Sequence, residues 1–259
     1  NALFSGLGIY VFRLGIVGVA LGTVLARLVG VLILWRELDL STIRWRWGLD
    51  GELLRLSLPA AGERLMMRAG DVVIIAIVVV FGTDAVAGNA IGEVLTQFNY
   101  MPAFGVATAT VMLVAHAVGE GDMQAVGLIR QRAFWLSFAC MLPVALGIYA
   151  LGRPLTLLYT DNSGAITASL SVILFSLLGT PMAAGTVIYT AVWQGLGNAR
   201  LPFYATTIGM WLIRIVSGYL LGVTFGLGLP GVWAGTLLDN GFRWLFLKVL
   251  FDRKMREIT

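Results

Sequence analysis

The sequence is poor in the residues on which most enzymes and secreted proteins rely. It holds one cysteine and one histidine, and 12% of its 259 residues are charged, compared with about 25% in an average soluble domain. The single thiol, Cys140, excludes a disulfide framework and a multi-thiolate metal site. With His116 as the lone histidine and no HExxH or GxSxG motif, the sequence argues against an enzyme. We therefore expect no catalytic residue, no metal and no cofactor.

Long apolar runs take the place of those residues. Hydrophobic residues make up 58% of the chain, and its mean hydropathy is +0.87. A helix needs about 20 mostly apolar residues to cross a hydrocarbon core of about 30 Å. Residues 1–12 are predicted to be the end of one span. Full spans are predicted at 14–36, 58–81, 85–117, 133–151, 166–194, 201–224 and 229–251. The predicted fold class is all-α, a polytopic helical bundle in a lipid bilayer.

Basic residues are concentrated in alternate connectors between these spans. One set of connectors holds Arg36, Arg44, Arg46, Arg55, Arg130, Arg132, Arg200, Arg243, Lys248, Arg253, Lys254 and Arg256, and the alternate set holds Arg13 and Arg153. A pI of about 9.5 could suggest nucleic acid, but this distribution is a topology signal. By the positive-inside rule we expect an integral protein of the cell (inner) membrane with a cytoplasmic C-terminus and no nucleic-acid partner.

One short line of sequence occurs twice. Leu14–Leu25 reads LGIVGVALGTVL, and Leu227–Leu238 reads LGLPGVWAGTLL, 213 positions later (227 − 14). Both copies enter a helix that descends towards the cytoplasmic side, and five predicted spans separate these two helices, so the helices run in the same direction. Parallel repeats of six spans are one known transporter architecture. The repeat therefore predicts a parent of about twelve helices in two lobes.

This repeat divides the chain into segments. Residues 1–36 are the predicted end of an N-terminal lobe, 37–57 a cytoplasmic connector between lobes, 58–251 a six-helix C-terminal lobe and 252–259 a cytoplasmic tail. Pro59 suits the first turn of a helix, so we expect the C-terminal lobe to begin beside it. The chain begins at Asn1 inside apolar sequence, and we expect further sequence upstream.

Several motifs together resemble the multidrug and toxic compound extrusion (MATE) transporters. They are Leu58-Pro59, FGTDAVAGNAIG (81–92), MPAFGVATATVMLVAHAVGEGD (101–122), LYTDNSGAI (158–166), AVWQGLGNARLPFYATTIGMWLIRIVSGYLL (191–221) and LGLPGVWAG (227–235). The resemblance implies twelve helices in two lobes around a V-shaped cavity, and export of organic cations or other amphipathic compounds in exchange for H⁺ or Na⁺ by alternating access. It identifies this chain as the end of helix 5, helix 6, and helices 7 to 12. The implied partners are the N-terminal lobe of the same parent, the bilayer and a small-molecule substrate.

The span 58–81 carries a cluster of ionisable residues. A charge at the centre of a membrane helix costs at least about 2.5–3.5 kcal/mol, so each one needs a partner or a role. Arg68 and Asp71 lie on one helix face and could form a local pair. Alternatively, Glu63 or Asp71 holds a coupling cation and a cationic substrate in turn, because one negative charge cannot neutralise both at once.

Two further sets of polar residues are predicted at similar depth. Glu93 lies about as deep as Asp71, so the two carboxylates could share a proton; Gln97, Asn99 and Tyr100 follow it towards Pro102, which either lines a cavity or only bends the helix. On the last two spans, the depths of Arg214 and Asp239 match within about a turn, which predicts a buried pair.

Aromatic and methionine side chains could form a wall for flat cations through cation–π contact, although each is individually more typical of core or lipid-facing positions: Met66, Met67, Tyr100, Met101, Tyr189, Trp193 and Trp211.

The chain departs from the family at two acidic positions. Where some members carry an acid eight residues after the proline, this chain has Met67, with Glu63 one turn earlier. Residues 180–191 lack the carboxylate that some members carry in helix 10. Coupling through the N-terminal lobe is therefore a competing hypothesis for the mechanism. For the function, the competing hypotheses are a lipid-linked glycan flippase of the same superfamily and a non-functional half-transporter.

Overall fold

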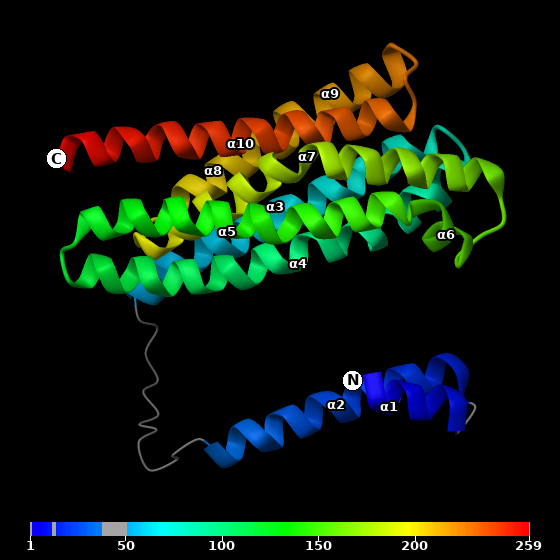
Figure 1. Cartoon of the computed structure of the whole chain (residues 1–259), viewed down its shortest axis with the longest axis horizontal. Helices are drawn as coiled ribbons and strands as arrows, with labels where there is room; N and C mark the ends of the chain where they lie inside the picture. Colours follow the sequence, from blue (N-terminus) through cyan, green and yellow to red (C-terminus); the bar gives the residue numbers. More distant parts are fainter. Residues whose placement is uncertain (1, 12–13, 38–50, 259) are drawn as a thin grey trace. The chain divides into compact units, whose positions relative to one another are not determined.

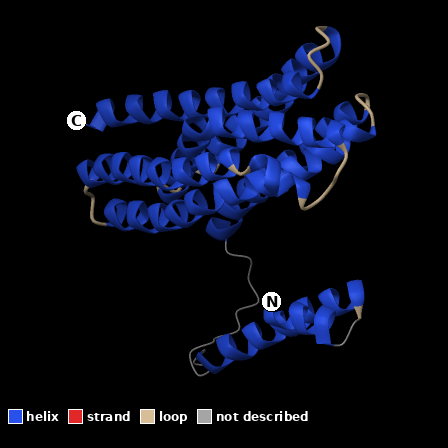
Figure 2. Cartoon of the chain, turned by 45° about the vertical axis from the view of Figure 1, so that its right-hand side comes forward, coloured by secondary structure: helices blue, strands red, loops and turns tan. Residues whose placement is uncertain are grey.

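The structure, a computed structural model, describes residues 2–11, 14–37 and 51–258 and consists of helices joined by short turns, with no strand in those ranges (Figures 1 and 2). The chain forms two compact units, one ending at Leu49 and one beginning at Asp50. Most of the predicted connector, residues 38–50, lies outside the described residues. The predicted all-α membrane bundle is confirmed.

The first unit is a helical hairpin. Helix α1 (Ala2–Gly6) continues into a π-helical turn, η1 (Leu7–Val11), and helix α2 (Gly15–Glu37) returns beside it. Gly15 has a φ of +54° at the turn, a conformation that residues with a side chain rarely adopt.

The second unit contains six long helical elements. They are α3 (Gly51–Val79), α4 (Thr83–Gly119), α5 (Met123–Ala150), α7 (Ser163–Gly195), the continuous run α8 (Arg200–Ile208), η3 (Gly209–Arg214), α9 (Ile215–Tyr219) and η4 (Leu220–Thr224), and α10 (Leu229–Ile258). The short helix α6 (Gly152–Leu157) connects α5 to α7. It lies at the end of this unit opposite the C-terminus (Figure 1).

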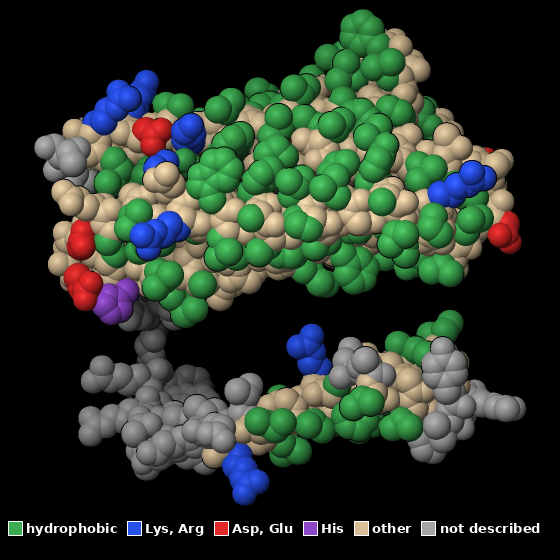
Figure 3. Space-filling model, viewed as in Figure 1, with side chains coloured by type: hydrophobic (Ala, Val, Ile, Leu, Met, Phe, Trp, Pro, Cys, Tyr) green, Lys and Arg blue, Asp and Glu red, His purple; other side chains and the backbone are tan. Residues whose placement is uncertain are grey.

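Five of the seven predicted spans correspond to helices long and apolar enough to cross a membrane: Gly15–Ile33, Thr83–Gly119, Met123–Ala150, Ser163–Gly195 and Arg200–Thr224. Helices α3 and α10 carry more charged residues. On the face of the second unit seen in Figure 3, the charged side chains gather towards its two ends and apolar side chains cover the middle. This distribution fits a bilayer whose hydrocarbon layer surrounds the middle of the bundle.

Two helix boundaries differ from those expected. Helix α3 begins at Gly51, so Pro59 lies inside it instead of in its first turn. Helix α10 continues through the predicted tail to Ile258. Both extensions are rich in Leu, Arg, Lys, Met and Glu, which favour helix even where the sequence is too polar to be recognised as a span.

Helix α7 is central to the packing of the second unit. It packs against α4, α5 and α10, and its N-terminal half meets α4 at two glycines of α4. A Cβ on Gly88 would lie 2.4 Å from the Ala168 Cβ, and one on Gly92 would lie 2.5 Å from the Val172 Cβ. The largest buried cluster lies nearer the C-terminal end and includes Val114, Val126, Ala133, Ile188, Val192, Leu247 and Phe251.

The hairpin of the first unit is held by backbone-to-backbone contact. A Cβ on Gly18 would lie 2.6 Å from the carbonyl oxygen of Gly8, and one on Gly22 would lie 2.6 Å from the amide nitrogen of Ser5. The amide of Leu14 donates to the Gly8 carbonyl at 3.0 Å. Helix α2 therefore crosses the preceding helix at the distance that only glycine permits.

The second glycine line makes the same contacts. A Cβ on Gly231 would lie 2.6 Å from the carbonyl carbon of Leu221, and one on Gly235 would lie 2.8 Å from the amide nitrogen of Gly218. The amide of Leu227 donates to the Leu221 carbonyl at 3.1 Å. Segments η1 and η4 are also separated by 213 residues (220 − 7). The sequence repeat is therefore a repeated structural motif, a π-turn followed by a glycine-packed hairpin.

Substituting Gly231 tests this contact. Gly231→Ala places a Cβ against backbone atoms that cannot move aside, so we expect a loss of about 1–3 kcal/mol in the free energy of unfolding, measured as a lower melting temperature of the full-length protein in detergent. Gly147→Ala is the control, because a Cβ at that helical position meets nothing within 4 Å. Equal melting temperatures for the two variants would contradict the prediction.

Candidate functional site

A network of charged and polar side chains lies between α3, α4, η3 and α10. At its centre Asp71 of α3 forms ion pairs with two arginines. Arg214 Nη1 lies 3.3 Å from Oδ1, and Arg68 Nη1 lies 3.5 Å from Oδ2. Arg214 Nε also donates to Thr236 Oγ1 at 3.0 Å. The Arg214 side chain is 12% exposed, whereas that of Arg68 is 86% exposed. The structure thus contains the Arg68–Asp71 contact that the spacing predicts, and adds a more buried partner from another helix.

The predicted Arg214–Asp239 pair is wrong. Asp239 is fully buried, and its Oδ2 accepts from Arg243 Nη2 at 2.6 Å. Arg243 lies one turn further along α10 and forms the ion pair with this carboxylate. Arg214 pairs with Asp71 instead. The i, i+4 spacing of Asp239 and Arg243 was a usable signal, but the basic residues that follow Arg243 made it resemble part of the cytoplasmic end of its helix.

Glycines and a π-helical turn make room for these groups. A Cβ on Gly209 would lie 2.2 Å from Asp239 Oδ1, and one on Gly70 would lie 2.2 Å from Met210 Cγ. Both Gly209 and Arg214 belong to η3, a π-helical segment, and such segments are frequent at functional sites. Helices α3, η3 and α10 therefore approach closely where the charges meet.

Glu63 lies at the edge of this network without an ion-pair partner among the described residues. Its Oε1 accepts a hydrogen bond from Thr206 Oγ1 at 3.0 Å, and the positive charges of Arg243 and Arg64 act on it. One turn further along α3, the sulfur of Met67 accepts from Arg243 Nη1 at 3.7 Å. Arg243 thereby connects the buried acid of α10 to the face of α3 that carries Glu63.

Tyr100 of α4 belongs to the network, but Asn99 lies elsewhere. The Tyr100 side chain reaches that of Asn240, and the charges of Arg214 and Arg243 act on it. Asn99 Nδ2 donates instead to Thr180 Oγ1 of α7 at 3.2 Å. This predicted site residue is therefore buried in the α4–α7 interface.

Glu93, Gln97 and Trp211 lie at exposed positions. Glu93 Oε1 accepts from Asn89 Nδ2 at 3.1 Å, and Asn89 Oδ1 accepts from Trp233 Nε1 at 2.9 Å. Within the described ranges Glu93 makes no contact with Asp71 of the kind that sharing a proton requires. Each of the two carboxylates is held by its own neighbours.

The described acidic side chains of this region lie singly and do not form a cluster that could bind a metal ion. Across the described parts of the chain, no three His, Cys, Asp or Glu side chains come together to hold a metal ion. Asp71 and Asp239 are each neutralised by arginine, whereas Glu63 and Glu93 accept hydrogen bonds from uncharged groups. Chemically, the two glutamates are the sites that can bind a proton, a monovalent cation or a cationic ligand.

Comparison with known proteins places the fold. The family model described as MatE matches residues 59–220. The chain is 31% identical over 249 residues to the probable multidrug resistance protein NorM of Thermotoga maritima, a match that covers 92% of this chain and 53% of that protein. It is 24% identical over 245 residues to the uncharacterized transporter YisQ of Bacillus subtilis, covering 90% and 53%. The chain spans about half the length of these relatives.

A solved structure titled "Crystal structure of MATE in the straight conformation" superposes with a TM-score of 0.87 at 20% identity, over 99% of this chain and 60% of that one. At that identity the likeness shows the fold. The matched family model covers most of the helical bundle that holds the charged network. The chain belongs to the MatE family, whose members are transporters and not enzymes.

Proposed function

We propose that the chain is the C-terminal lobe, with the last helices of the N-terminal lobe, of a secondary antiporter that exports organic cations or other amphipathic compounds in exchange for H⁺ or Na⁺. Support comes from the family, from the name "multidrug resistance protein" of its relatives and from the half-length match. The partner is then the N-terminal lobe of the same parent, in a cell membrane, with the C-terminus on the cytoplasmic side.

The observation that carries this proposal is the unpaired carboxylate of Glu63. A carboxylate in a membrane helix is costly unless a positive charge balances it. Glu63 receives one hydroxyl hydrogen bond from Thr206. Arg64 and Arg243 act on it without forming an ion pair, and Arg243 is already bound to Asp239. Glu63 is partly exposed, so a ligand can reach it. Its remaining negative charge suits a cation from outside the lobe.

A single carboxylate of this kind can couple two fluxes. A proton or Na⁺ bound to Glu63 removes the charge that a cationic substrate needs, and the substrate in turn displaces the ion. Only differential binding of this sort can drive an exchange. Glu93, which accepts from the neutral Asn89, is the second candidate in this lobe.

The paired charges have a different role in this proposal. Arg214 joins η3 to α3 through Asp71 and to α10 through Thr236. The pair is partly buried, and breaking an ion pair is more costly the less water can replace the lost partner, so we expect these helices to move together. Alternating access by rocking of one lobe against the other requires that rigidity.

The flippase hypothesis is less well supported. Binding a lipid-linked pyrophosphate needs several unpaired cations facing a cavity. Three arginines of α3 and η3 are available within the membrane-spanning parts of this lobe: Arg64, Arg68 and Arg214. Arg68 and Arg214 both pair with Asp71, which leaves Arg64 alone. The carboxylates left open in this lobe favour a cationic ligand over an anionic one.

Replacing Glu63 tests the cation site. In the full-length transporter we expect Glu63→Gln to reduce efflux of a fluorescent organic cation from energised cells by about tenfold or more, since interactions with a charged group contribute about 1.5–3 kcal/mol. Glu120→Gln is the control, because that exposed acid pairs with His116 at the end of α4. Equal efflux by both variants, at matched expression, would remove Glu63 from the exchange.

A double-mutant cycle tests the strut between α3 and η3. We expect Asp71→Asn and Arg214→Gln each to lower the melting temperature, and the double variant to lose less than their sum, with an interaction energy of about 0.5–3 kcal/mol. The same cycle with Arg68→Gln should give almost no coupling, because that arginine is exposed. Equal coupling in the two cycles, or none with Arg214, would contradict this role.

A further inference from the structure

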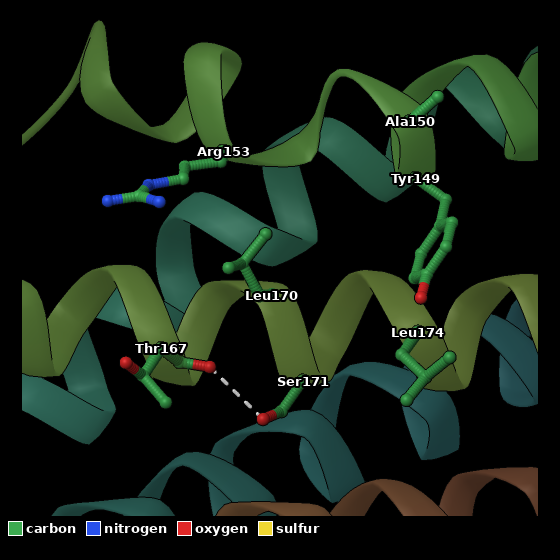
Figure 4. Close-up of a pocket in the computed structure, with 7 residues that line it drawn as sticks. All are labelled: Tyr149, Ala150, Arg153, Thr167, Leu170, Ser171 and Leu174. Atoms are coloured by element: carbon green, nitrogen blue, oxygen red, sulfur yellow. Dashed lines mark hydrogen bonds between the residues drawn. The ribbon is translucent and has the colours of Figure 1, made fainter.

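A groove of about 490 Å³ lies far from the charged network, beside α6 at the end of the second unit opposite the C-terminus (Figure 1), and Figure 4 shows its lining. The end of α5 and the first turn of α6 form one wall, with Tyr149 and Arg153. One face of α7 forms the other, with Thr167, Leu170, Ser171 and Leu174 at helical spacing. No described residue of the network lines it.

The polarity of the groove changes with depth. Arg153 and Thr167 lie nearest the end of the bundle, and Leu174 lies about 10 Å further along α7 than Thr167. Leu170 forms the floor between them (Figure 4). The groove therefore has a cation near the end of the bundle, and further along α7 it has leucine side chains with the Tyr149 hydroxyl beside Leu174 (Figure 4).

Of the four polar side chains that line the groove, two already donate hydrogen bonds within α7 and two do not. Ser171 Oγ donates to the Thr167 carbonyl at 3.1 Å, the bond drawn in Figure 4, and Thr167 Oγ1 donates to the Ser163 carbonyl at 2.9 Å. The Arg153 guanidinium and the Tyr149 hydroxyl have no partner among the described residues. A ligand with several acceptor oxygens can accept hydrogen bonds from both of these groups.

No nearby acid in the described part of the chain neutralises Arg153. A neighbouring hollow shares Thr167 and Ser171 with the groove, and there Asp84 Oδ1 of α4 accepts from Asn162 Nδ2 at 2.9 Å. No ion pair joins Arg153 to any described carboxylate. An unpaired guanidinium at a membrane surface binds phosphate oxygens well, because its planar donors match them in geometry and charge.

We propose that this groove binds the headgroup of a glycerophospholipid from the adjacent leaflet. The phosphodiester accepts from the Arg153 guanidinium, an ester carbonyl accepts from the Tyr149 hydroxyl, and an acyl chain lies along Leu170 and Leu174. Inorganic phosphate would leave the leucines exposed, and a cationic transport substrate is repelled by Arg153. The site is thus a lipid site and separate from the proposed exchange at Glu63.

Lipid titration of the delipidated full-length transporter in detergent tests the site. We expect dioleoylphosphatidylethanolamine to raise its melting temperature in a saturable way, and neither dioleoylglycerol, which lacks the phosphate, nor inorganic phosphate to do so. Arg153→Gln should weaken the apparent affinity for the phospholipid about tenfold, as loss of a charged hydrogen bond predicts. A zwitterionic lipid is chosen to minimise long-range attraction to basic residues.

Matched variants separate this site from general lipid binding. Arg153→Lys should retain part of the affinity, Tyr149→Phe should lose a smaller part, and Arg132→Gln, which removes an exposed arginine near the opposite end of α5, should behave as the wild type. Equal stabilisation by dioleoylglycerol, no response to the phospholipid, or an unchanged affinity in Arg153→Gln would each overturn the proposal. Because the readout is binding, the result does not depend on whether Glu63 couples transport.

Discussion

A charge inside a hydrocarbon layer must be balanced where it lies, and this constraint organises the second unit. Asp71 lies between two arginines, and the fully buried Asp239 is bound by Arg243. The Arg214–Asp71 pair joins different helices, so balancing the charge also fixes how those helices are rotated. Glu63 and Glu93 differ, because neither forms an ion pair among the described residues and each accepts a hydrogen bond from an uncharged group, although the charges of two nearby arginines act on Glu63. The same constraint makes the paired acids structural and leaves these two acids as the candidates for binding a cation in the proposed exchange.

Close backbone packing makes the charged network possible. In a bilayer the lipid is as apolar as the helices, so helix association depends on close contact and on hydrogen bonds between helices. The lack of a side chain at Gly209 admits the carboxylate of Asp239, and at Gly70 it admits Met210. The hairpin glycines, among them Gly18 and Gly231, apply the same rule where a helix turns back on itself. Small residues thus determine where the polar groups can meet.

Several features that depend on one helix at a time could be predicted from the sequence, although the Asp239–Arg243 pair within α10 was missed. Apolar runs located the long helices, and the i, i+3 spacing located the Arg68–Asp71 contact. Contacts between helices were harder, because depth along a helix follows from residue count but rotation about its axis does not. The π-helical segment η3 changes that rotation just before Arg214. The similar depth of Arg214 and Asp239 predicted that they pair, whereas the Arg214 side chain points towards Asp71 and pairs with it.

The distribution of unpaired charge indicates how such a lobe would work in exchange. The lobe has its own apolar core around α7. Its electrostatics are different, because Glu63 and Glu93 form no ion pair with a described arginine and accept hydrogen bonds from uncharged groups. In the proposed mechanism a bound cation supplies the missing charge, and releasing it restores the imbalance. In this proposal, a lobe that packs around its own core but leaves two acids without an ion pair moves as one body, while its affinity depends on which ion or substrate is bound.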